Sequence, residues 1–215
     1  MTKGIIITLP RYDDVTEYIS QFSKYIIDEA KNRGILIKEL KDKEVTKVHL
    51  DKILNGIRYK MVIFNGHGSE SCIFGHKGEK IMECNSNEKL LSGRIIYARS
   101  CDAASKLGKS IIEHDKTGSF IGYELPFVFY HNPQWEANPL KDNVARIFLE
   151  PSNAIPISII KGNEAGYAHH NGRKLFLKNM RKSLLTKSVE ALSFAEALWT
   201  NYIGQVIYGN EAATL

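Results

Sequence analysis

Short apolar runs recur along the chain, separated by longer amphipathic segments. Four runs, at residues 4–9, 61–64, 95–98 and 119–123, are rich in β-branched and aromatic side chains. Continuous runs of this length predict strands that are buried on both faces of a sheet. Residues 35–40 instead alternate apolar and polar side chains, which predicts a strand nearer the sheet edge.

The segments between these runs have helical periodicity. Apolar residues from Val15 to Ala30 recur at helical spacing, and Gly34 follows as a C-terminal stop. A helix at residues 45–55 is predicted to use Val48, Ile53 and Leu54 as core contacts. Further helices are predicted at residues 87–91, 107–114, 142–149, 175–185 and 189–202, and residues 162–170 fit either a helix or a mobile turn.

Alternating strands and helices predict a single α/β domain over residues 1–215. We expect a three-layer sandwich with a mainly parallel sheet of about six strands, the last at residues 205–208, flanked by helices. Residues 71–75 and 80–84 predict a β-hairpin across which Cys72 and Cys84 face each other.

Residues 124–156 interrupt this pattern with five of the six prolines in the chain. Long irregular excursions of this kind often form functional loops or lids, so one of the two is expected here. Trp135 and Trp199 are expected to pack in the lid and the core rather than to contact a cofactor.

Composition narrows the class of protein. The chain of 215 residues is 43% hydrophobic and 25% charged, with 29 basic against 24 acidic residues and a net charge of +5. These values are ordinary for a globular protein. Most basic residues are scattered, so neither nucleic-acid nor membrane binding is expected. Only one group of basic residues resembles a patch: Arg173, Lys174, Lys178, Arg181 and Lys182.

The three cysteines, Cys72, Cys84 and Cys101, cannot all pair with one another, and none has zinc-ligand spacing with a histidine. This sparse, odd number fits a reducing compartment. The N-terminal run is too short for a signal peptide and ends at Pro10. We therefore expect a cytoplasmic protein without a metal or cofactor.

Two of the apolar runs end at reactive side chains. His67 follows the run 61–64, and Cys101 follows the run 95–98. If the two runs are neighbouring parallel strands, both side chains emerge at the carboxyl edge of the sheet. A thiol beside an imidazole is the minimum apparatus for nucleophilic catalysis. The alternatives are a buried structural cysteine and an ordinary loop histidine.

The arrangement of these blocks resembles the caspase/hemoglobinase-fold cysteine peptidases (clan CD), which include caspases, metacaspases, legumains, gingipains, separases and CHAT domains. Their pattern is a hydrophobic block, His-Gly, a second hydrophobic block, and a small residue before the nucleophilic cysteine. It is matched here by residues 61–64, His67-Gly68, residues 95–98 and Ser100-Cys101. The end of the chain, at residues 206–210, is similar to the end of CHAT domains, whereas the caspase Gln-Ala-Cys motif is absent.

The resemblance implies a cysteine endopeptidase of CHAT-like or caspase-like prokaryotic type. Cys101 would be the nucleophile, His67 the general base and acid, and the backbone N–H groups of Gly68 and Cys101 the oxyanion hole. A helix beginning near Ala103 would favour the thiolate through its dipole. No third member of the site is evident in the sequence, which fits a dyad.

Specificity for the substrate residue before the scissile bond (P1) is expected from charged residues near Cys101. Arg99 lies two residues before the cysteine and Arg11 follows the first strand; two guanidinium groups favour an acidic P1 residue. The alternatives are that Arg99 is neutralised by Asp102, Asp13 or Asp14, or that Glu124 forms a pocket for a basic P1 residue.

Two other classes of function compete with the peptidase. The chain fits a catalytically silent caspase-like subunit that binds a larger partner, since family peptidases are often controlled by partner proteins. A flavodoxin-like nucleotide-binding domain is disfavoured, because no glycine-rich phosphate loop follows the first strand.

Overall fold

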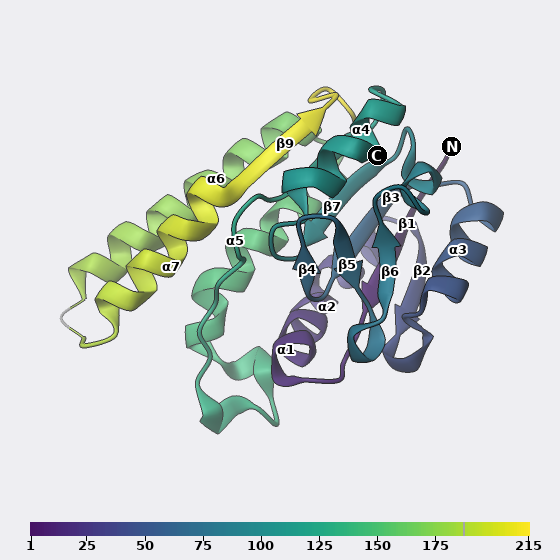
Figure 1. The fold of residues 1–215 in the computed structure, drawn as a ribbon. Helices are drawn as coiled ribbons and strands as arrows, with labels where there is room; N and C mark the ends of the chain where they lie inside the picture. The colour runs from purple at the N-terminus through teal and green to yellow at the C-terminus, as the bar shows by residue number, and fades with distance from the viewer. Residues whose placement is uncertain (187) are drawn as a thin grey trace.

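A six-stranded sheet forms the centre of the molecule (Figure 1). The computed structural model describes residues 1–186 and 188–215. The strand order is β2-β1-β3-β7-β8-β9, and every neighbouring pair is parallel except β8 and β9. The strands are β1 (Thr2–Leu9), β2 (Leu36–Lys41), β3 (Tyr59–Asn65), β7 (Ile95–Arg99), β8 (Ser119–Tyr123) and β9 (Gln205–Gly209). The predicted mainly parallel α/β sheet, with residues 35–40 at an edge, is confirmed.

Helices cover both faces of this sheet. They are α1 (Asp14–Phe22), α2 (Lys24–Asn32), α3 (Lys47–Gly56), α4 (Lys109–His114), α5 (Asn143–Ile160), α6 (Ala165–Leu185) and α7 (Ala191–Gly204). Five 3-10 turns, η1 (Asp42–Glu44), η2 (His76–Gly78), η3 (Glu88–Leu91), η5 (Pro133–Trp135) and η6 (Pro139–Lys141), and one π-helical segment, η4 (Ala104–Gly108), complete the described connections.

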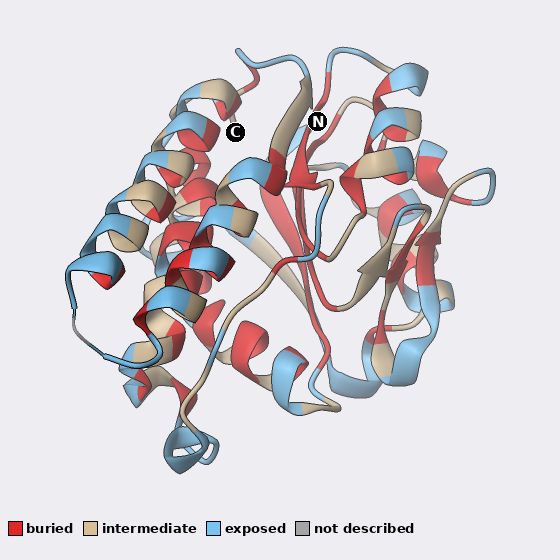
Figure 2. Cartoon of the chain, turned by 60° about the vertical axis from the view of Figure 1, so that its left-hand side comes forward, coloured by how far each residue is buried: buried red, intermediate tan, exposed pale blue. Residues whose placement is uncertain are grey.

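Strand side chains alternate between two apolar layers, as the pleat of a sheet requires. Ile6 and Val62 pack with residues of α3 and α4, whereas Ile5 and Met61 pack with residues of α2 and α5. Figure 2 shows these strands as buried and the outward faces of the helices as exposed. A sheet covered on both faces explains why its strands are continuous apolar runs in the sequence.

A second, three-stranded antiparallel sheet follows β3, with strands β4 (Gly68–Ser69), β5 (Cys72–Phe74) and β6 (Lys80–Glu83). The predicted hairpin is therefore confirmed. Cys72 pairs with Glu83 rather than facing Cys84, because the register is offset by one residue.

The helix predicted from Val15 to Ala30 is two helices, divided at Ser23. The Ser23 hydroxyl donates a hydrogen bond to the Ile19 carbonyl oxygen at 2.9 Å. A serine side chain that bonds the preceding turn in this way bends a helix. In α3, Ile53 and Leu54 pack against the core as predicted, but Val48 is 75% exposed, so that contact was predicted wrongly.

Two prolines lie inside α5, which was predicted to end at residue 149. The helix starts at an Asp142 cap, whose carboxylate accepts from the Val144 and Ala145 N–H groups. Pro151 and Pro156 are buried in it, so burial outweighs the hydrogen bonds that proline removes. Residues 165–185 form one continuous helix, and Trp199 is 47% exposed, so it is not a core residue.

Helices α6 and α7 pack against each other as a long antiparallel hairpin, which projects away from the sheet (Figure 1). No helix in the described ranges combines the length and the apolar character that crossing a membrane requires.

Candidate functional site

The ends of β3 and β7 bring the two candidate catalytic segments together. These strands are parallel neighbours, with Asn65 opposite Arg99, so the segments that follow them leave the sheet at the same edge. A Cβ atom added to Gly68 would lie 2.5 Å from the Cys101 carbonyl oxygen and 3.1 Å from the Cys101 nitrogen. The His67-Gly68 segment is thus in van der Waals contact with the backbone of Cys101.

Local structure fixes the course of the His67 segment. Gly66 has φ of 139°, and a Cβ there would lie 2.6 Å from the Phe74 carbonyl oxygen, so only glycine fits. The Phe74 N–H donates to the His67 carbonyl oxygen at 2.9 Å. The small sheet therefore holds His67 from one side while β3 holds it from the other.

A carboxylate orients the His67 ring. The His67 Nε2 atom lies 2.8 Å from Asp13 Oδ2, at a site where both side chains are partly exposed. An ionised carboxylate only accepts hydrogen bonds, so Nε2 carries the proton and, in the neutral ring, Nδ1 is left as the basic nitrogen.

Asp13 also caps α1, where its Oδ1 accepts from the Thr16 N–H at 2.8 Å and the Thr16 hydroxyl at 2.7 Å. Burial alone would raise the Asp13 pKa, but the hydrogen bonds from Thr16 and His67 outweigh it and hold the pKa below its ordinary value. Asp13 is therefore an ionised, fixed acceptor for His67 at neutral pH.

Cys101 is partly buried in its loop. Its Sγ lies 3.9 Å from the Phe127 carbonyl oxygen, and within the described residues neither Cys101 nor His67 is a hydrogen-bond partner of the other. Burial raises the pKa of the Cys101 thiol; a backbone hydrogen bond of Phe127 partly offsets this, and the Asp102 charge adds to it. The thiol is therefore protonated at neutral pH in this conformation.

A helical segment begins beside Cys101. The π-helical segment η4, whose N-cap is Ala103, starts at Ala104 and continues directly into the regular helix α4 at Lys109. The predicted helix start near Ala103 is therefore confirmed, whereas its effect on the thiolate stays a prediction.

The segment that follows β8, residues 124–132, lies against Cys101 and is fixed to α7. The Asn201 side-chain amide bonds both backbone groups of Val128, accepting from its N–H at 2.8 Å and donating to its carbonyl at 2.7 Å. Tyr130 packs on Phe194 of α7, with ring centroids 5.3 Å apart. We call residues 124–132 the cover loop, because Phe127 contacts the candidate nucleophile.

Arg99 does not reach a substrate surface. Its side chain is 1% exposed, and its Nη2 donates to Asn153 Oδ1 of α5 at 2.5 Å. The Nε and Nη1 atoms have no hydrogen-bond partner in the described part of the chain. The partner of Arg99 is the neutral amide of Asn153. Among the described residues, therefore, Arg99 is not neutralised by Asp102, Asp13 or Asp14, as one alternative had predicted.

Arg11 lies at the surface and is already paired. Its guanidinium makes two hydrogen bonds to Glu17, at 2.7 and 2.6 Å, and lies 4.0 Å from Asp42. It shares no partner with Arg99, so this conformation does not assemble a two-guanidinium site for an acidic side chain.

Glu124 and Asp102 differ in their surroundings. Glu124 is 2.8 Å from Lys109 Nζ and accepts from the Tyr208 hydroxyl, and these bonds lower the Glu124 pKa. Burial of the Tyr208 hydroxyl and its hydrogen bond to Glu124 both raise the Tyr208 pKa, to about 12. Asp102 has φ of 57°, and its pKa is raised by burial and by the nearby Glu70 charge.

In residues 1–186 and 188–215, no group of three or more His, Cys, Asp or Glu side chains gathers as a ligand set for a metal ion.

Sequence reasoning missed three side chains of this site. Asp13 was considered as a partner of Arg99 but not of His67; its position after β1, the neighbour of β3, is the signal that pointed to it. Asn153 and Asn201 are buried amides on helices distant in sequence, and no local pattern distinguishes them.

Comparison with known proteins supports the fold assignment. No protein-family model and no curated protein sequence matches the chain. Among solved structures, it is similar to the Arg specific cysteine proteinase gingipain R (RGPB), with a TM-score of 0.62 and 13% identity over 99% of this chain and 47% of that one. It is also similar to the complex of Porphyromonas gingivalis RgpB pro- and mature domains, with a TM-score of 0.60 and 11% identity over 98% and 48% of the two chains.

The chain thus has the caspase-like fold of the gingipains and spans about half the length of those chains. At this identity the likeness concerns the fold, which is the one that the resemblance to clan CD implied. The CHAT-like assignment and the extent of a single domain over residues 1–215 stay predictions.

Proposed function

We propose that this chain is a cysteine endopeptidase that uses Cys101 as nucleophile and His67 as general base and acid. The observation that carries the proposal is the contact of Gly68 with the Cys101 backbone, which places the two reactive segments at one edge of the sheet. The bond from His67 to Asp13 adds an orienting carboxylate, so the proposed site is a triad rather than the predicted dyad.

The proposed reaction proceeds through an acyl-enzyme. His67 Nδ1 takes the Cys101 thiol proton, the sulfur attacks the peptide carbonyl carbon, and the proton passes to the departing amine nitrogen. A water molecule then cleaves the thioester and restores the thiol. The backbone N–H groups of Gly68 and Cys101 are the proposed oxyanion donors, because they belong to the two segments in contact.

The structure corresponds to a resting form in this proposal. The Cys101 thiol contacts the Phe127 carbonyl, and burial raises its pKa, so few molecules hold the reactive thiolate at neutral pH. We propose that displacement of the cover loop by a partner or signal releases Cys101 toward His67.

The P1 preference is proposed from the charges that remain accessible. Arg99 is buried and Arg11 is paired, which weakens the acidic-P1 hypothesis. Glu70 and Glu124 are likewise paired, with Lys106 and Lys109, whereas Asp102, the neighbour of Cys101 in the chain, forms no ion pair among the described residues. This unpaired carboxylate favours a basic P1 residue. A fluorogenic panel with Asp, Glu, Arg and Lys at P1 tests this; faster cleavage after Asp or Glu would reverse the assignment.

The experiment that tests the peptidase itself compares wild type with Cys101→Ala and His67→Ala. Each variant should abolish cleavage while leaving the thermal unfolding temperature close to that of wild type. N-terminal mapping of a proteome treated with active protein or Cys101→Ala should then reveal the substrate. A wild-type protein that cleaves nothing, and whose Cys101 resists a peptidyl chloromethyl ketone, would instead support a silent binding subunit.

A further inference from the structure

Helix α6 concentrates the positive charge of the chain. It contains Arg173, Lys174, Lys178, Arg181 and Lys182, and no Asp or Glu occurs between Ala165 and Thr186. The chain has 29 basic and 24 acidic residues, so removing these five leaves equal numbers of both. The net charge of +5 therefore belongs to one helix.

These five cations also lack acidic partners among the described residues, although the Arg173 guanidinium lies over the Tyr202 ring, 4.3 Å from its centroid. Lysines and arginines on other elements form ion pairs, as in Lys24–Asp28, Lys106–Glu70 and Lys109–Glu124. None of the five on α6 pairs with a carboxylate in the described part of the chain. A helix face with unpaired like charges is destabilised by its own repulsion, which an acidic partner would relieve.

Two hollows flank the C-terminal half of α6. One, of about 560 Å³, is lined by Lys174, Leu177, Lys178, Arg181, Lys182 and Leu185. The other, of about 530 Å³, lies between α5, α6 and α7 and is lined by Ile147, Phe194 and Lys182, and by Glu150, which pairs with Arg146 at 3.5 Å. Because Lys182 lines both, we treat the two hollows as one surface and call it the basic groove.

The basic groove combines apolar and cationic contacts at helical spacing. Leu177 and Leu185 are eight residues apart on α6, roughly 12 Å along the helix axis. Leu185 is 84% exposed, so the described residues leave this apolar surface uncovered. Leucine side chains make no hydrogen bond or ion pair with nucleic-acid phosphates. A concave surface also fits the side chains of a bound helix better than it fits a flat bilayer.

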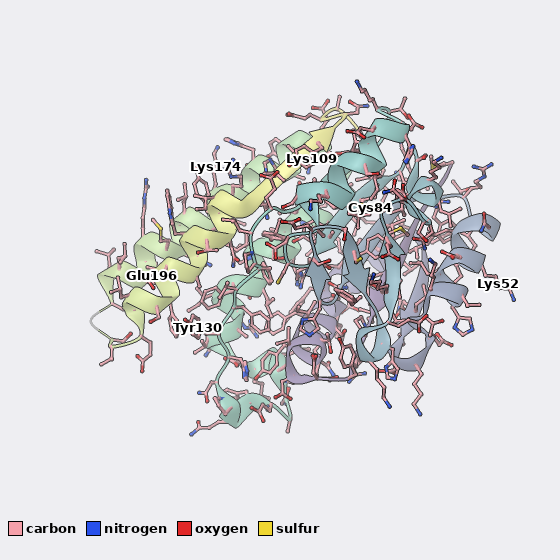
Figure 3. The ribbon with its side chains drawn as sticks, in the orientation of Figure 1. Lys52, Cys84, Lys109, Tyr130, Lys174 and Glu196 are labelled. Atoms are coloured by element: carbon pink, nitrogen blue, oxygen red, sulfur yellow. The ribbon has the colours of Figure 1, made fainter. Side chains whose placement is uncertain are left out.

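We propose that the basic groove binds an acidic amphipathic helix of a partner protein. Apolar side chains of such a helix, about seven residues apart, would contact the hollows at Leu177, Leu185 and Phe194. Its carboxylates would pair with Lys178, Arg181 and Lys182. Figure 3 shows Lys174, Glu196 and Tyr130 on one side of the molecule, far from Lys52 on α3.

The groove is connected to the candidate nucleophile by packed side chains. Phe194, in the groove, packs on Tyr130 of the cover loop and edge-on against Phe148, and Asn201 of the same helix α7 bonds Val128. The cover loop in turn contacts Cys101 through the Phe127 carbonyl. A helix seated in the groove would therefore displace the cover loop; this part of the inference rests on the proposed function of Cys101.

Binding is tested with a synthetic probe and the full chain carrying Cys101→Ala, so that no cleavage is needed. The probe is a fluorescent 16-residue helix-forming peptide with leucines seven residues apart and glutamates on the flanking positions. Two comparison peptides replace the glutamates by lysine or the leucines by serine. Fluorescence anisotropy should show binding of the first peptide and loss of binding for both comparison peptides.

Charge-reversal variants localise the site. Lys178→Glu with Lys182→Glu should weaken the affinity on the order of tenfold or more, since like charges across an interface are strongly unfavourable. The matched control, Lys52→Glu with Lys116→Glu, reverses two exposed lysines elsewhere and should leave the affinity unchanged. No binding of the acidic peptide, or equal losses in both variants, would overturn the proposal. Phosphatidylglycerol vesicles and duplex DNA are tested in the same way. If either binds more tightly than the acidic peptide, and this binding is lost in the Lys178→Glu/Lys182→Glu variant but not in the control, the groove binds a different class of ligand and the proposal is overturned.

A separate measurement tests the connection to Cys101. The rate at which iodoacetamide labels Cys101 in wild type, followed by mass spectrometry, should rise several-fold when the acidic peptide is bound. Labelling does not require peptide hydrolysis, so this result is independent of whether the chain proves to be a peptidase. Peptide binding without any change in the rate would overturn the connection between groove and cover loop.

Discussion

His67 and Asp13 are joined by a 2.8 Å hydrogen bond between Nε2 and Oδ2, although 54 residues separate them in the chain. The same Asp13 carboxylate caps helix α1 through Thr16. One acidic residue therefore fixes both the start of a helix and the orientation of the proposed general base.

Replacing Asp13 by Asn separates these two roles. Asn is as good a helix cap as Asp, so the unfolding temperature should change little. The amide can present its nitrogen to Nε2 and favour the wrong tautomer, so kcat/KM for peptide cleavage should fall on the order of 10²- to 10⁴-fold. Unchanged kcat/KM in Asp13→Asn would show that the carboxylate has only a structural role.

The lowered Asp13 pKa also predicts a pH dependence of stability. The unfolded carboxylate protonates near its ordinary pKa of about 3.9, above the pKa in the folded protein. Its stabilising contribution is therefore complete above pH ~4 and is lost as the pH falls through the folded pKa. Urea titrations should therefore show wild type losing unfolding free energy relative to Asp13→Asn as the pH falls below ~4, whereas the difference between the two should stay constant near pH ~7.

Gly68→Ala tests the contact between the two catalytic segments. The added Cβ would lie 2.5 Å from the Cys101 carbonyl oxygen and 2.8 Å from Ser100 Cβ, so the segments must separate. We expect a loss of about 1–3 kcal/mol in unfolding free energy and a larger loss of activity. Gly56→Ala is the control: nothing lies within 4 Å of its Cβ position, and a helical Ala should be neutral or slightly stabilising. Equal effects in the two variants would argue against the contact.

Asn201→Ala should loosen the cover loop. The substitution leaves both backbone groups of Val128 without their partner, which should cost about 1–3 kcal/mol of unfolding free energy. We also expect faster alkylation of Cys101 and faster proteolysis within residues 124–132. A less stable protein whose Cys101 reacts no faster would show that Asn201 does not restrain this loop.

Arg99→Met tests whether this buried cation binds substrate or only packs. Two of its nitrogen atoms have no partner in the described ranges, and replacing such a buried charge by an apolar side chain is often neutral or stabilising. We expect an unchanged or higher unfolding free energy and an unchanged ratio of activities on Asp and Arg P1 substrates. Asn153→Ala, by contrast, should destabilise by about 3 kcal/mol, because it removes the partner and leaves the charge buried. A selective loss of cleavage after Asp in Arg99→Met would restore its role in specificity.

Local pattern located the strands well and the helices less well. The runs at residues 61–64 and 95–98 became β3 and β7 because burial on both faces demands continuous apolar residues. The division at Ser23 and the continuation of α5 through Pro151 were not predicted, since a side-chain bond and burial against other elements outweighed helix propensity.

The sequence by itself determined the α/β fold and the placement of His67, Gly68 and Cys101 after two buried strands, because strand periodicity and chain order are local properties. Only the tertiary structure decided that Asp13 faces His67, that Arg99 is buried against Asn153, and that Phe127 contacts Cys101. These contacts join residues 26 to 54 positions apart, and the burial that sets each pKa depends on packing between elements. A pattern within one segment cannot predict contacts between residues that are so far apart in the sequence.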